Sequence, residues 1–237
     1  TLKLLDIELI AKTAHAFNPD IRVIVDNTFC TPYLQRPLEL GADVVVHSAT
    51  KYLNGHGDVV AGFSAARKEI MDQIRMVRLK DITGAMLGPQ EAFLILRGLK
   101  TLKVRMDAVC ANTQKVVDFL AGSKYVQKVF YPSLENHPDH AVAVREMTRF
   151  GGVVSFEMGS FEEAKKVLNH VHLCAGRQPW RLRDAHPASG FHDALHVHER
   201  RDQDRRLLGS PDPSGSRSGR HRYIIADLQQ AFEAVQN

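Results

Sequence analysis

The sequence predicts an α/β fold, and three patterns in its 237 residues lead to that prediction. In residues 1–88, short apolar runs typical of buried strands alternate with stretches of helical spacing. A long helical pattern follows over residues 89–122. In the C-terminal part, residues 123–237, strand and helix patterns alternate again up to residue 174, and a helical pattern returns at Ile224. We therefore expect part of a large domain with a mainly parallel sheet, a connecting helix, and a small C-terminal α/β domain.

The elements of the large domain are predicted from apolar spacing and from clusters of β-branched residues. In chain order they are a helix at Asp6–Phe17, strands at Ile21–Val25 and Val44–Val46, an apolar run at Val59–Phe63 and an amphipathic stretch at Arg67–Val77.

In the connecting helix, Gly98 is the one weak point. The elements predicted after it are strands at Val126–Phe130, Val153–Phe156 and Val171–Cys174, helices at Asp139–Arg149 and Phe161–His170, and a terminal helix that begins at Ile224.

The segment 176–223 differs in composition from the rest of the chain. It contains ten arginines and five histidines and shows no sustained apolar period, which indicates a loop or disorder. The sequence pattern seen before residue 176 returns briefly at residues 186–189 and again from Ile224. We interpret the segment as translated from a shifted reading frame, an interpretation that a continuous frame in the encoding DNA would contradict.

Composition bounds the class of protein. A hydrophobic content of 44% can supply a core, and no apolar run approaches the length of a membrane span. Three widely spaced cysteines argue against a disulfide framework and for a reducing, cytoplasmic location. The net charge of +4 comes from arginines in one segment that lacks an aromatic stacking platform, so we expect no nucleic-acid partner.

The most informative stretch is V-V-V-H-S-A-T-K-Y-L-N-G-H-G, residues 44–57. A buried strand ends there in small hydroxyl residues, and a lysine follows. Ser48 and Thr50 can donate hydrogen bonds to a phosphate, and Lys51 can form a Schiff base with an aldehyde. The alternative is an ordinary solvated lysine with two hydroxyls that cap the strand end.

A second stretch, I-R-V-I-V-D-N-T-F-C, ends an apolar strand with Asp26. A carboxylate at a buried strand end needs a cationic partner, and a protonated pyridine nitrogen is one. That pairing makes the ring an electron sink. Taken alone, Asp26 is better explained as a turn or helix-cap acid; the strand-Ser-x-Thr-Lys pattern that follows favours the first interpretation.

These stretches resemble a known family. V-D-N-T-F, Q-R-P-L-E-L-G-A-D, H-S-A-T-K-Y-L-N-G-H-G-D and R-G-L-K-T-L-x-x-R-M are similar to motifs of the Cys/Met-metabolism family of pyridoxal-phosphate enzymes. The resemblance is dense over residues 1–175 and returns at residues 224–236. It implies the fold type I architecture of pyridoxal-phosphate-dependent transferases, and the chain corresponds to the C-terminal part of such an enzyme.

The resemblance also implies roles for individual residues. Lys51 would hold pyridoxal 5'-phosphate and act as the catalytic base, Asp26 would pair with the ring nitrogen, and Ser48 and Thr50 would bind the phosphate. Lys80 and Asp81 lie in L-K-D-I-T-G, which is similar to the version in methionine γ-lyases, and would shape the substrate pocket. A surface ion pair is the alternative for these two residues.

The implied reaction is carbon–sulfur bond cleavage, with L-methionine converted to methanethiol, 2-oxobutanoate and ammonia. Cystathionine γ-lyase or β-lyase activity is the first alternative, and a catalytically inactive fragment is the second. Family members carry an earlier segment with further cofactor-binding groups, so we expect the chain alone to be a poor catalyst. The resemblance further implies a homo-oligomer, a tetramer built from dimers.

Other reactive side chains are interpreted as structural. His47 and His56 are expected to be satisfied by nearby backbone, and Cys30 to be a small buried filler. The spacing of His192, His196 and His198 could place zinc ligands on a helical face, but we expect no metal site. Arg181, Arg183 and Arg217 cannot be matched to the family's substrate-carboxylate arginine.

Overall fold

The structure is a computed structural model that describes residues 2–172, 194–198 and 220–236. It divides into two compact units. The N-terminal unit holds Leu4–Asp107 and Pro138–Gly151, and the C-terminal unit holds Thr1–Lys3, Ala108–His137 and Gly152–Asn237. The α/β class expected from the sequence is confirmed.

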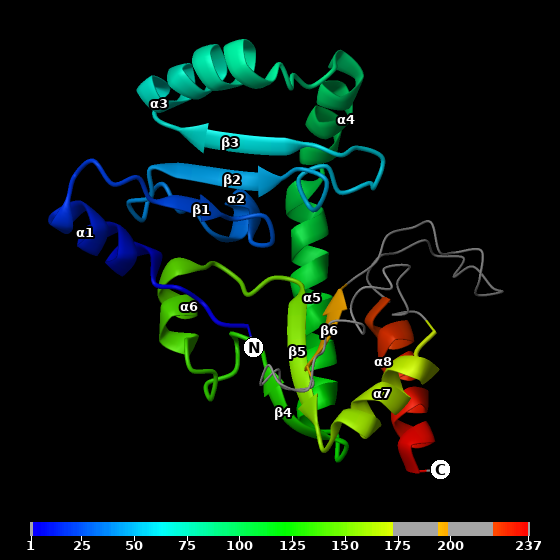
Figure 1. Ribbon diagram of the computed structural model, residues 1–237. Coiled ribbons are helices and arrows are strands. Elements are labelled where there is room, and N and C mark those ends of the chain that lie inside the picture. Colours follow the sequence, from blue (N-terminus) through cyan, green and yellow to red (C-terminus); the bar gives the residue numbers. More distant parts are fainter. Residues whose placement is uncertain (1, 173–193, 199–219, 237) are drawn as a thin grey trace. The chain divides into compact units, whose positions relative to one another are not determined.

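The N-terminal unit is built on one three-stranded sheet with helices around it (Figure 1). Its elements are α1 (Ile7–Phe17), β1 (Ile24–Asp26), α2 (Thr31–Leu34), β2 (Val44–Ser48), β3 (Gly62–Ala66), α3 (Lys68–Asp72), the π-helix η1 (Gln73–Thr83), α4 (Pro89–Leu99) and α6 (His140–Glu146).

The sheet of this unit has the order β1-β2-β3 and is mixed. β1 pairs with β2 in parallel, from Ile24↔Val44 to Asp26↔Val46, whereas β2 and β3 are antiparallel. The expectation of a mainly parallel sheet therefore holds for one of the two described pairs. A parallel pair needs a crossover connection, and the chain between β2 and β3 contains no helix that could provide one.

The core of this unit lies between α1 and the sheet. Ile7 and Ala11 of α1 pack with Val23 and Ala42, and all four are buried. Because Ile7 and Ala11 are one helical turn apart, they face the same side of α1. The amphipathic spacing that predicted this helix is thus used to cover the sheet.

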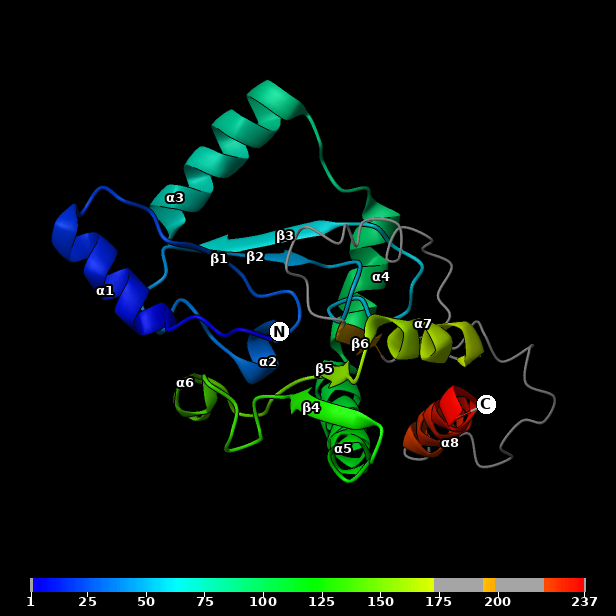
Figure 2. The ribbon, with the colours of Figure 1, turned by 60° about the horizontal axis from the view of Figure 1, so that its bottom comes forward.

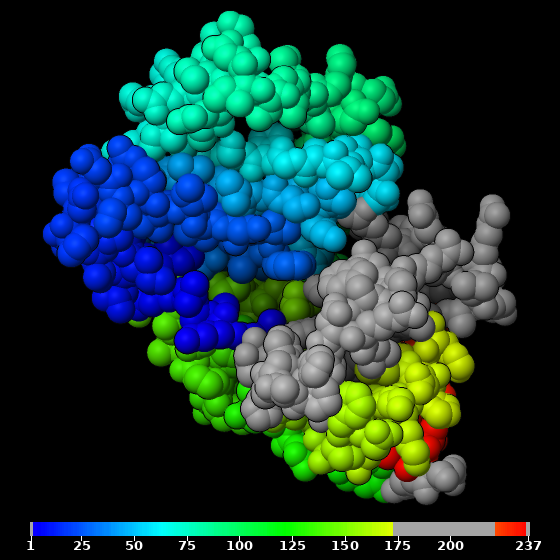
Figure 3. All heavy atoms as spheres, viewed as in Figure 1, coloured from blue at the N-terminus to red at the C-terminus, as the bar shows by residue number. Residues whose placement is uncertain are grey.

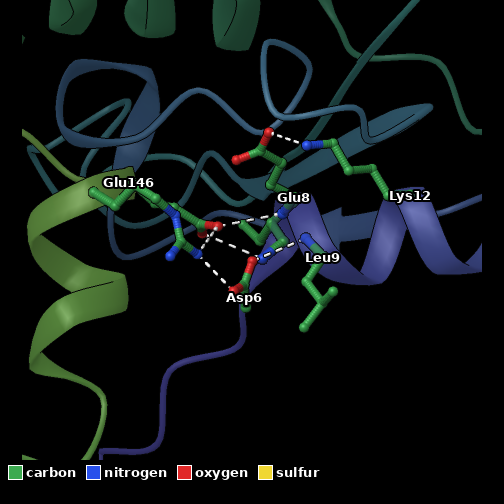
Figure 4. A network of polar contacts seen from close by, with 7 residues as sticks. Asp6, Glu8, Leu9, Lys12 and Glu146 are labelled. Atoms are coloured by element: carbon green, nitrogen blue, oxygen red, sulfur yellow. Dashed lines mark hydrogen bonds and ion pairs between the residues drawn. The ribbon is translucent and has the colours of Figure 1, made fainter.

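A buried carboxylate attaches the segment 138–151 to the start of α1 (Figure 4). The side chain of Glu146 is 1% exposed and accepts hydrogen bonds from the backbone N–H groups of Ile7 (3.2 Å) and Glu8 (3.2 Å). Arg145 adds an ion pair to Asp6 at 2.6 Å. An anion at the positive end of a helix satisfies N–H groups that have no partner within the helix. This contact explains why residues distant in sequence belong to the same unit.

The long helix predicted for residues 89–122 is two helices, α4 and α5 (Leu102–Ala121). The turn between them follows Leu99, and the Gly98 carbonyl accepts hydrogen bonds from the backbone N–H of Thr101 (3.2 Å) and from its hydroxyl (3.1 Å). These bonds end α4 in place of continued helical pairing.

The C-terminal unit contains a second three-stranded sheet, antiparallel in the order β4-β5-β6, and two helices beside each other (Figure 2). Its further elements are β4 (Val126–Phe130), β5 (Val153–Met158), α7 (Phe161–His170), β6 (Ala194–His198), α8 (Arg220–Glu233) and the 3-10 helix η5 (Ala234–Gln236).

The core of this unit centres on Phe232 of α8. Its ring is fully buried, stacks on Phe119 of α5 at 6.2 Å, and contacts Tyr125 (5.6 Å) and Phe156 (6.0 Å). Aromatic pairs at such distances add to the stability gained from burial. The predicted terminal helix is confirmed, and this ring explains its place in the unit.

One predicted strand is not found. Val171 and His172 lie outside any strand, and Cys174 lies outside the described residues. The N–H of His172 donates to the Asp227 carboxylate (2.9 Å to Oδ1), so it is not available to a strand partner. Of the segment 176–223, the structure describes β6 and the start of α8. For the remainder, the expectation of irregular chain stays a prediction.

Candidate functional site

The candidate site lies at one edge of the N-terminal sheet. Because β1 and β2 are parallel, their carboxyl ends meet at the same edge. Asp26 is the last residue of β1 and is paired in register with Val46, so Ser48, the last residue of β2, lies two positions further along. The structure therefore brings together the acid and the first hydroxyl residue that the sequence predicted.

Thr28 links these two strand ends, and the sequence analysis missed it. Its hydroxyl donates to Asp26 Oδ1 at 2.6 Å and accepts the Ser48 backbone N–H at 2.7 Å. Its own N–H donates to the same Asp26 oxygen at 3.0 Å. Thr28 is 5% exposed, so these bonds are shielded from water. They orient the carboxylate and leave Oδ2 without a hydrogen bond in the described part of the chain.

Asp26 itself is exposed. The burial penalty that the sequence analysis invoked for this acid therefore does not act on it in the described chain. What the structure retains is the orientation: one carboxylate oxygen is occupied by Thr28, and the other is available to a cation.

His47 lies between the strand-end residues and is buried. Burial lowers the pKa of His47, and the nearby Asp26 charge opposes this shift. The ring is therefore neutral near pH 7. A hydrogen bond with the Asn27 backbone also opposes the lowering of the pKa, which fits the expectation of a backbone partner for His47, although its Nδ1 has no hydrogen-bond partner among the described residues. For His56 the expectation is confirmed, because its Nδ1 lies 2.7 Å from the Asn54 carbonyl oxygen.

Lys51 lies in a turn that begins where β2 ends, and we call residues 49–55 the Lys51 turn. The backbone N–H of Lys51 donates to the Ser48 carbonyl at 3.2 Å, and its carbonyl accepts the Gly55 N–H at 2.9 Å. Gly55 has φ +75°, a conformation that glycine adopts without strain. The side chain of Lys51 is exposed. The turn thus holds the lysine backbone on both sides and presents its side chain outward.

The two hydroxyl residues before Lys51 are held differently. Thr50 accepts the Ala61 N–H at 3.0 Å, and its contact with the Ala61 carbonyl is long at 3.4 Å. Ser48 makes no side-chain hydrogen bond in the described part of the chain, although its backbone is fixed by Thr28. A hydroxyl is a donor suited to an anion such as phosphate, and the hydroxyl of Ser48 is not engaged in the described part of the chain.

Lys80 and Asp81 lie on η1, away from this set of contacts. They form an ion pair at 3.7 Å, and their side chains are 64% and 58% exposed. No residue of η1 is buried, and its atoms form an outer edge of the unit (Figure 3). In the described chain they are a surface ion pair, and their role in a substrate pocket stays a prediction.

Other predicted groups lie partly or wholly outside the described residues. His196 and His198 belong to β6, a strand, so the helical face supposed for zinc ligands is not formed; His192 is not described. No cluster of metal-binding side chains occurs in the part of the chain that the structure describes. Cys30, the N-cap of α2, is half-buried. The arginines without an assigned role, Arg181, Arg183 and Arg217, are not described.

The helices were also tested for membrane spans. Within residues 2–172, 194–198 and 220–236, no helix combines the length and the apolar character needed to cross a bilayer.

The sequence matches one family model, described as Cys/Met metabolism PLP-dependent enzyme, over residues 1–184. An L-methionine γ-lyase from Fusobacterium nucleatum is 47% identical, with 99% of this chain aligned to 60% of the relative. An L-methionine γ-lyase from Treponema denticola is 46% identical over 98% of this chain and 58% of its own length. The chain therefore spans about three fifths of these relatives.

Two further similarities extend the comparison. A cystathionine β-lyase from Lactococcus lactis is 52% identical over 72% of this chain and 44% of its own length. The crystal structure of metB from Corynebacterium glutamicum superimposes with a TM-score of 0.79 at 34% identity, covering 98% of this chain and 59% of that one.

Proposed function

The chain belongs to the Cys/Met-metabolism family of pyridoxal-phosphate-dependent enzymes, and on that premise we propose that it forms part of a carbon–sulfur lyase acting on L-methionine. The observation that carries the proposal is the edge where β1 and β2 end. The two strands are parallel neighbours, so their ends bring together the oriented carboxylate of Asp26, the hydroxyl residues Ser48 and Thr50, and the Lys51 turn.

The residues at this edge fit the cofactor chemically. The hydroxyls of Ser48 and Thr50 are donors for phosphate oxygens, and Oδ2 of Asp26 is an acceptor for a protonated ring nitrogen. The amine of Lys51 is the nucleophile that an aldehyde requires. When bound, pyridoxal phosphate supplies this aldehyde and a ring that accepts the electron pair left at the substrate Cα.

The side chains of this chain then have separate tasks. Asp26 holds a proton on the ring nitrogen, and Thr28 keeps the carboxylate turned for it. Lys51 would act as the base that removes the proton from the substrate Cα and would move a proton at Cβ, so that the γ-sulfur can leave. The net reaction converts L-methionine and water to methanethiol, 2-oxobutanoate and ammonia.

The choice of methionine is supported by the two γ-lyase relatives, which align over nearly the whole chain. Lys80 and Asp81 are the residues that we propose for this selectivity. The alternative is a cystathionine γ-lyase or β-lyase, which the 52% identity to the Lactococcus β-lyase favours over a shorter stretch. A catalytically inactive chain is the second alternative.

We also propose a cytoplasmic homo-oligomer, a tetramer built from dimers. Exposed apolar side chains on α4 support an assembly, since Phe93 and Leu96 are 59% and 62% exposed. The wide spacing of the cysteines supports a reducing compartment. Light scattering on the protein expressed from its complete gene would give the number of copies, and a monomer would contradict the assembly.

The function is tested by supplying that protein with pyridoxal phosphate and measuring products. We expect the absorption band of lysine-bound cofactor, and methanethiol from L-methionine at a higher kcat/KM than cysteine or homocysteine from cystathionine. Lys51→Ala should abolish both the band and turnover. A higher kcat/KM for cystathionine would replace methionine with the alternative, and a band that persists in Lys51→Ala would refute the lysine assignment.

A further inference from the structure

A buried arginine contacts the backbone that directly follows Lys51. Arg105 of α5 is 6% exposed and uses all three guanidinium nitrogens as donors. Nη1 donates to the Tyr52 carbonyl at 2.7 Å, and Nη2 contacts the Leu53 carbonyl at 3.4 Å. The guanidinium thus binds the carbonyls of the two residues that follow Lys51 in the chain.

The other bonds of this guanidinium anchor it to the junction of α4 and α5. Nη2 also donates to the Gly98 carbonyl at 2.9 Å, and Nε donates to the Thr101 hydroxyl at 3.0 Å. The Gly98 carbonyl belongs to the negative end of α4, which favours a cation there. Arg105 therefore connects the Lys51 turn to the end of one helix and the start of another.

Two glycines, Gly55 and Gly98, have no side chain and therefore allow the turn, the guanidinium and α4 to pack this closely. A Cβ on Gly55 would lie 2.1 Å from Arg105 Nη1, and a Cβ on Gly98 would lie 2.1 Å from the Asn54 carbonyl oxygen. Real Cβ atoms do not approach heavy atoms so closely. The turn, the guanidinium and α4 are therefore packed at backbone contact, so a shift of one must move the others.

A lysine cannot replace this arginine. The guanidinium is a planar fork whose donors reach several carbonyls at once, whereas an ammonium is a compact charge on a flexible stem. Removing the guanidinium deletes its hydrogen bonds to the Tyr52 and Leu53 carbonyls, and the loss of a charged hydrogen bond in a site shielded from water is costly. These requirements make the position sensitive to the shape of the side chain and not only to its charge.

We propose that Arg105 is a positioning residue for Lys51: it fixes the turn on which the lysine is carried and so sets where the amine meets the cofactor aldehyde. The inference rests on the proposed function for its chemistry.

The test compares Arg105→Lys and Arg105→Ala with two controls. Arg36→Lys changes an arginine whose side chain is 67% exposed, and Glu146→Gln weakens the buried attachment of α1 without touching the turn. The first readout is hydrogen exchange of the peptide covering residues 49–57, without cofactor. Because one to two charged hydrogen bonds are lost, we expect exchange about tenfold faster or more in both Arg105 variants and unchanged in both controls.

The second readout is the rate at which pyridoxal phosphate becomes attached to Lys51, trapped by borohydride and quantified by peptide mass. We expect about a tenfold loss or more in both Arg105 variants and none in the controls. Added guanidinium chloride at low millimolar concentration should restore part of the rate in Arg105→Ala, and equal sodium chloride should not. A role in overall stability alone predicts that Glu146→Gln is slowed as well.

The outcomes separate this inference from the function on which it rests. Wild-type attachment rates in Arg105→Lys would overturn the inference and leave the function standing. If the wild-type protein attaches no cofactor at Lys51, the proposed function fails, and faster exchange alone would then reduce Arg105 to a structural residue. If Arg105→Ala does not fold, as judged by circular dichroism, Arg105→Lys decides on both readouts.

Discussion

The Lys51 turn and η1 both carry predicted site residues, and the N-terminal unit holds them in opposite ways. The turn is bound through its backbone by Ser48, by internal hydrogen bonds and by the buried Arg105. η1 has no buried residue, and its predicted site residues contact each other at the surface. The described chain thus contains a supported turn, for which we propose cofactor chemistry, and an exposed segment, for which we propose substrate selection. The difference leads us to expect that substitutions in the first segment change stability and cofactor attachment together, whereas those in the second leave both unchanged.

The largest expected effect on stability comes from Gly98→Ala, which should disrupt the packing of α4 against the Lys51 turn. The added methyl group would meet the Asn54 carbonyl, a backbone atom that cannot turn aside. We expect a loss of about 3 kcal/mol in the free energy of unfolding, measured by urea denaturation. Gly62→Ala is the matched control, since nothing lies within 4 Å of its Cβ position. Equal stability of the two variants would show that α4 does not support the turn.

Thr28→Val should have the next largest effect. The substitution keeps the shape but removes the hydroxyl that joins Asp26 to the Ser48 N–H. A buried donor left unpaired costs about 1–3 kcal/mol, and the ring nitrogen should lose its oriented partner. We expect lower stability in urea and weaker binding of pyridoxal phosphate. The comparison on η1 is Thr83→Val, because the hydroxyl of Thr83 is exposed and makes only long contacts in the described chain, to the Leu79 carbonyl (3.3 Å) and from the Ala85 N–H (3.4 Å). A Thr28 variant as stable as the Thr83 variant would contradict this account of the edge.

The pH dependence of stability should also distinguish buried from exposed acids. Burial acts to raise the pKa of Asp43, but hydrogen bonds from the Val23 N–H (2.8 Å) and from His15 (2.8 Å) outweigh it, so the pKa is lowered. A lowered pKa means that the carboxylate stabilises the fold above its unfolded pKa of about 3.9 and loses that contribution as pH falls.

We therefore expect the thermal midpoint to fall between about pH 5 and pH 3, and the fall to be smaller in Asp43→Asn. Asp81→Asn, which changes an exposed acid, should follow the wild-type curve. If the thermal midpoint of Asp43→Asn depended on pH as in the wild type, the Asp43 carboxylate would not contribute to the stability of this unit.

The smallest effect on stability is expected from Lys80→Met and Asp81→Asn. An exposed ion pair contributes roughly 0–1 kcal/mol, so unfolding in urea should be nearly unchanged. The proposed role predicts instead a change in the ratio of kcat/KM for L-methionine to that for cystathionine. An unchanged ratio would leave this pair as a surface contact only.

The sequence predicted which residues lie at the strand ends better than the contacts that hold them. Asp26 and Ser48 were found because each ends an apolar run, and parallel strands bring such ends together. The roles of Thr28 and Arg105 were missed, although both lie in motifs that were recognised. Their partners are 20 and more than 50 positions away, and a one-dimensional pattern does not reveal such hydrogen bonds.

The predictions of some fold elements were wrong for comparable reasons. The antiparallel β3 follows from a connection without a crossover helix, which the apolar runs alone did not reveal. The break between α4 and α5 depends on side-chain bonds to the Gly98 carbonyl, so helical spacing on either side did not predict it. β6 lies in a segment whose composition obscured its strand pattern.

The central claim is that Lys51, at the end of β2, is the residue that binds the cofactor. The most direct measurement is to incubate the protein with pyridoxal phosphate, reduce it with borohydride and map the modified peptide by mass spectrometry. The account predicts one modified site, Lys51, and its loss in Lys51→Ala. Modification at another lysine, or spread evenly over the exposed lysines, would contradict it.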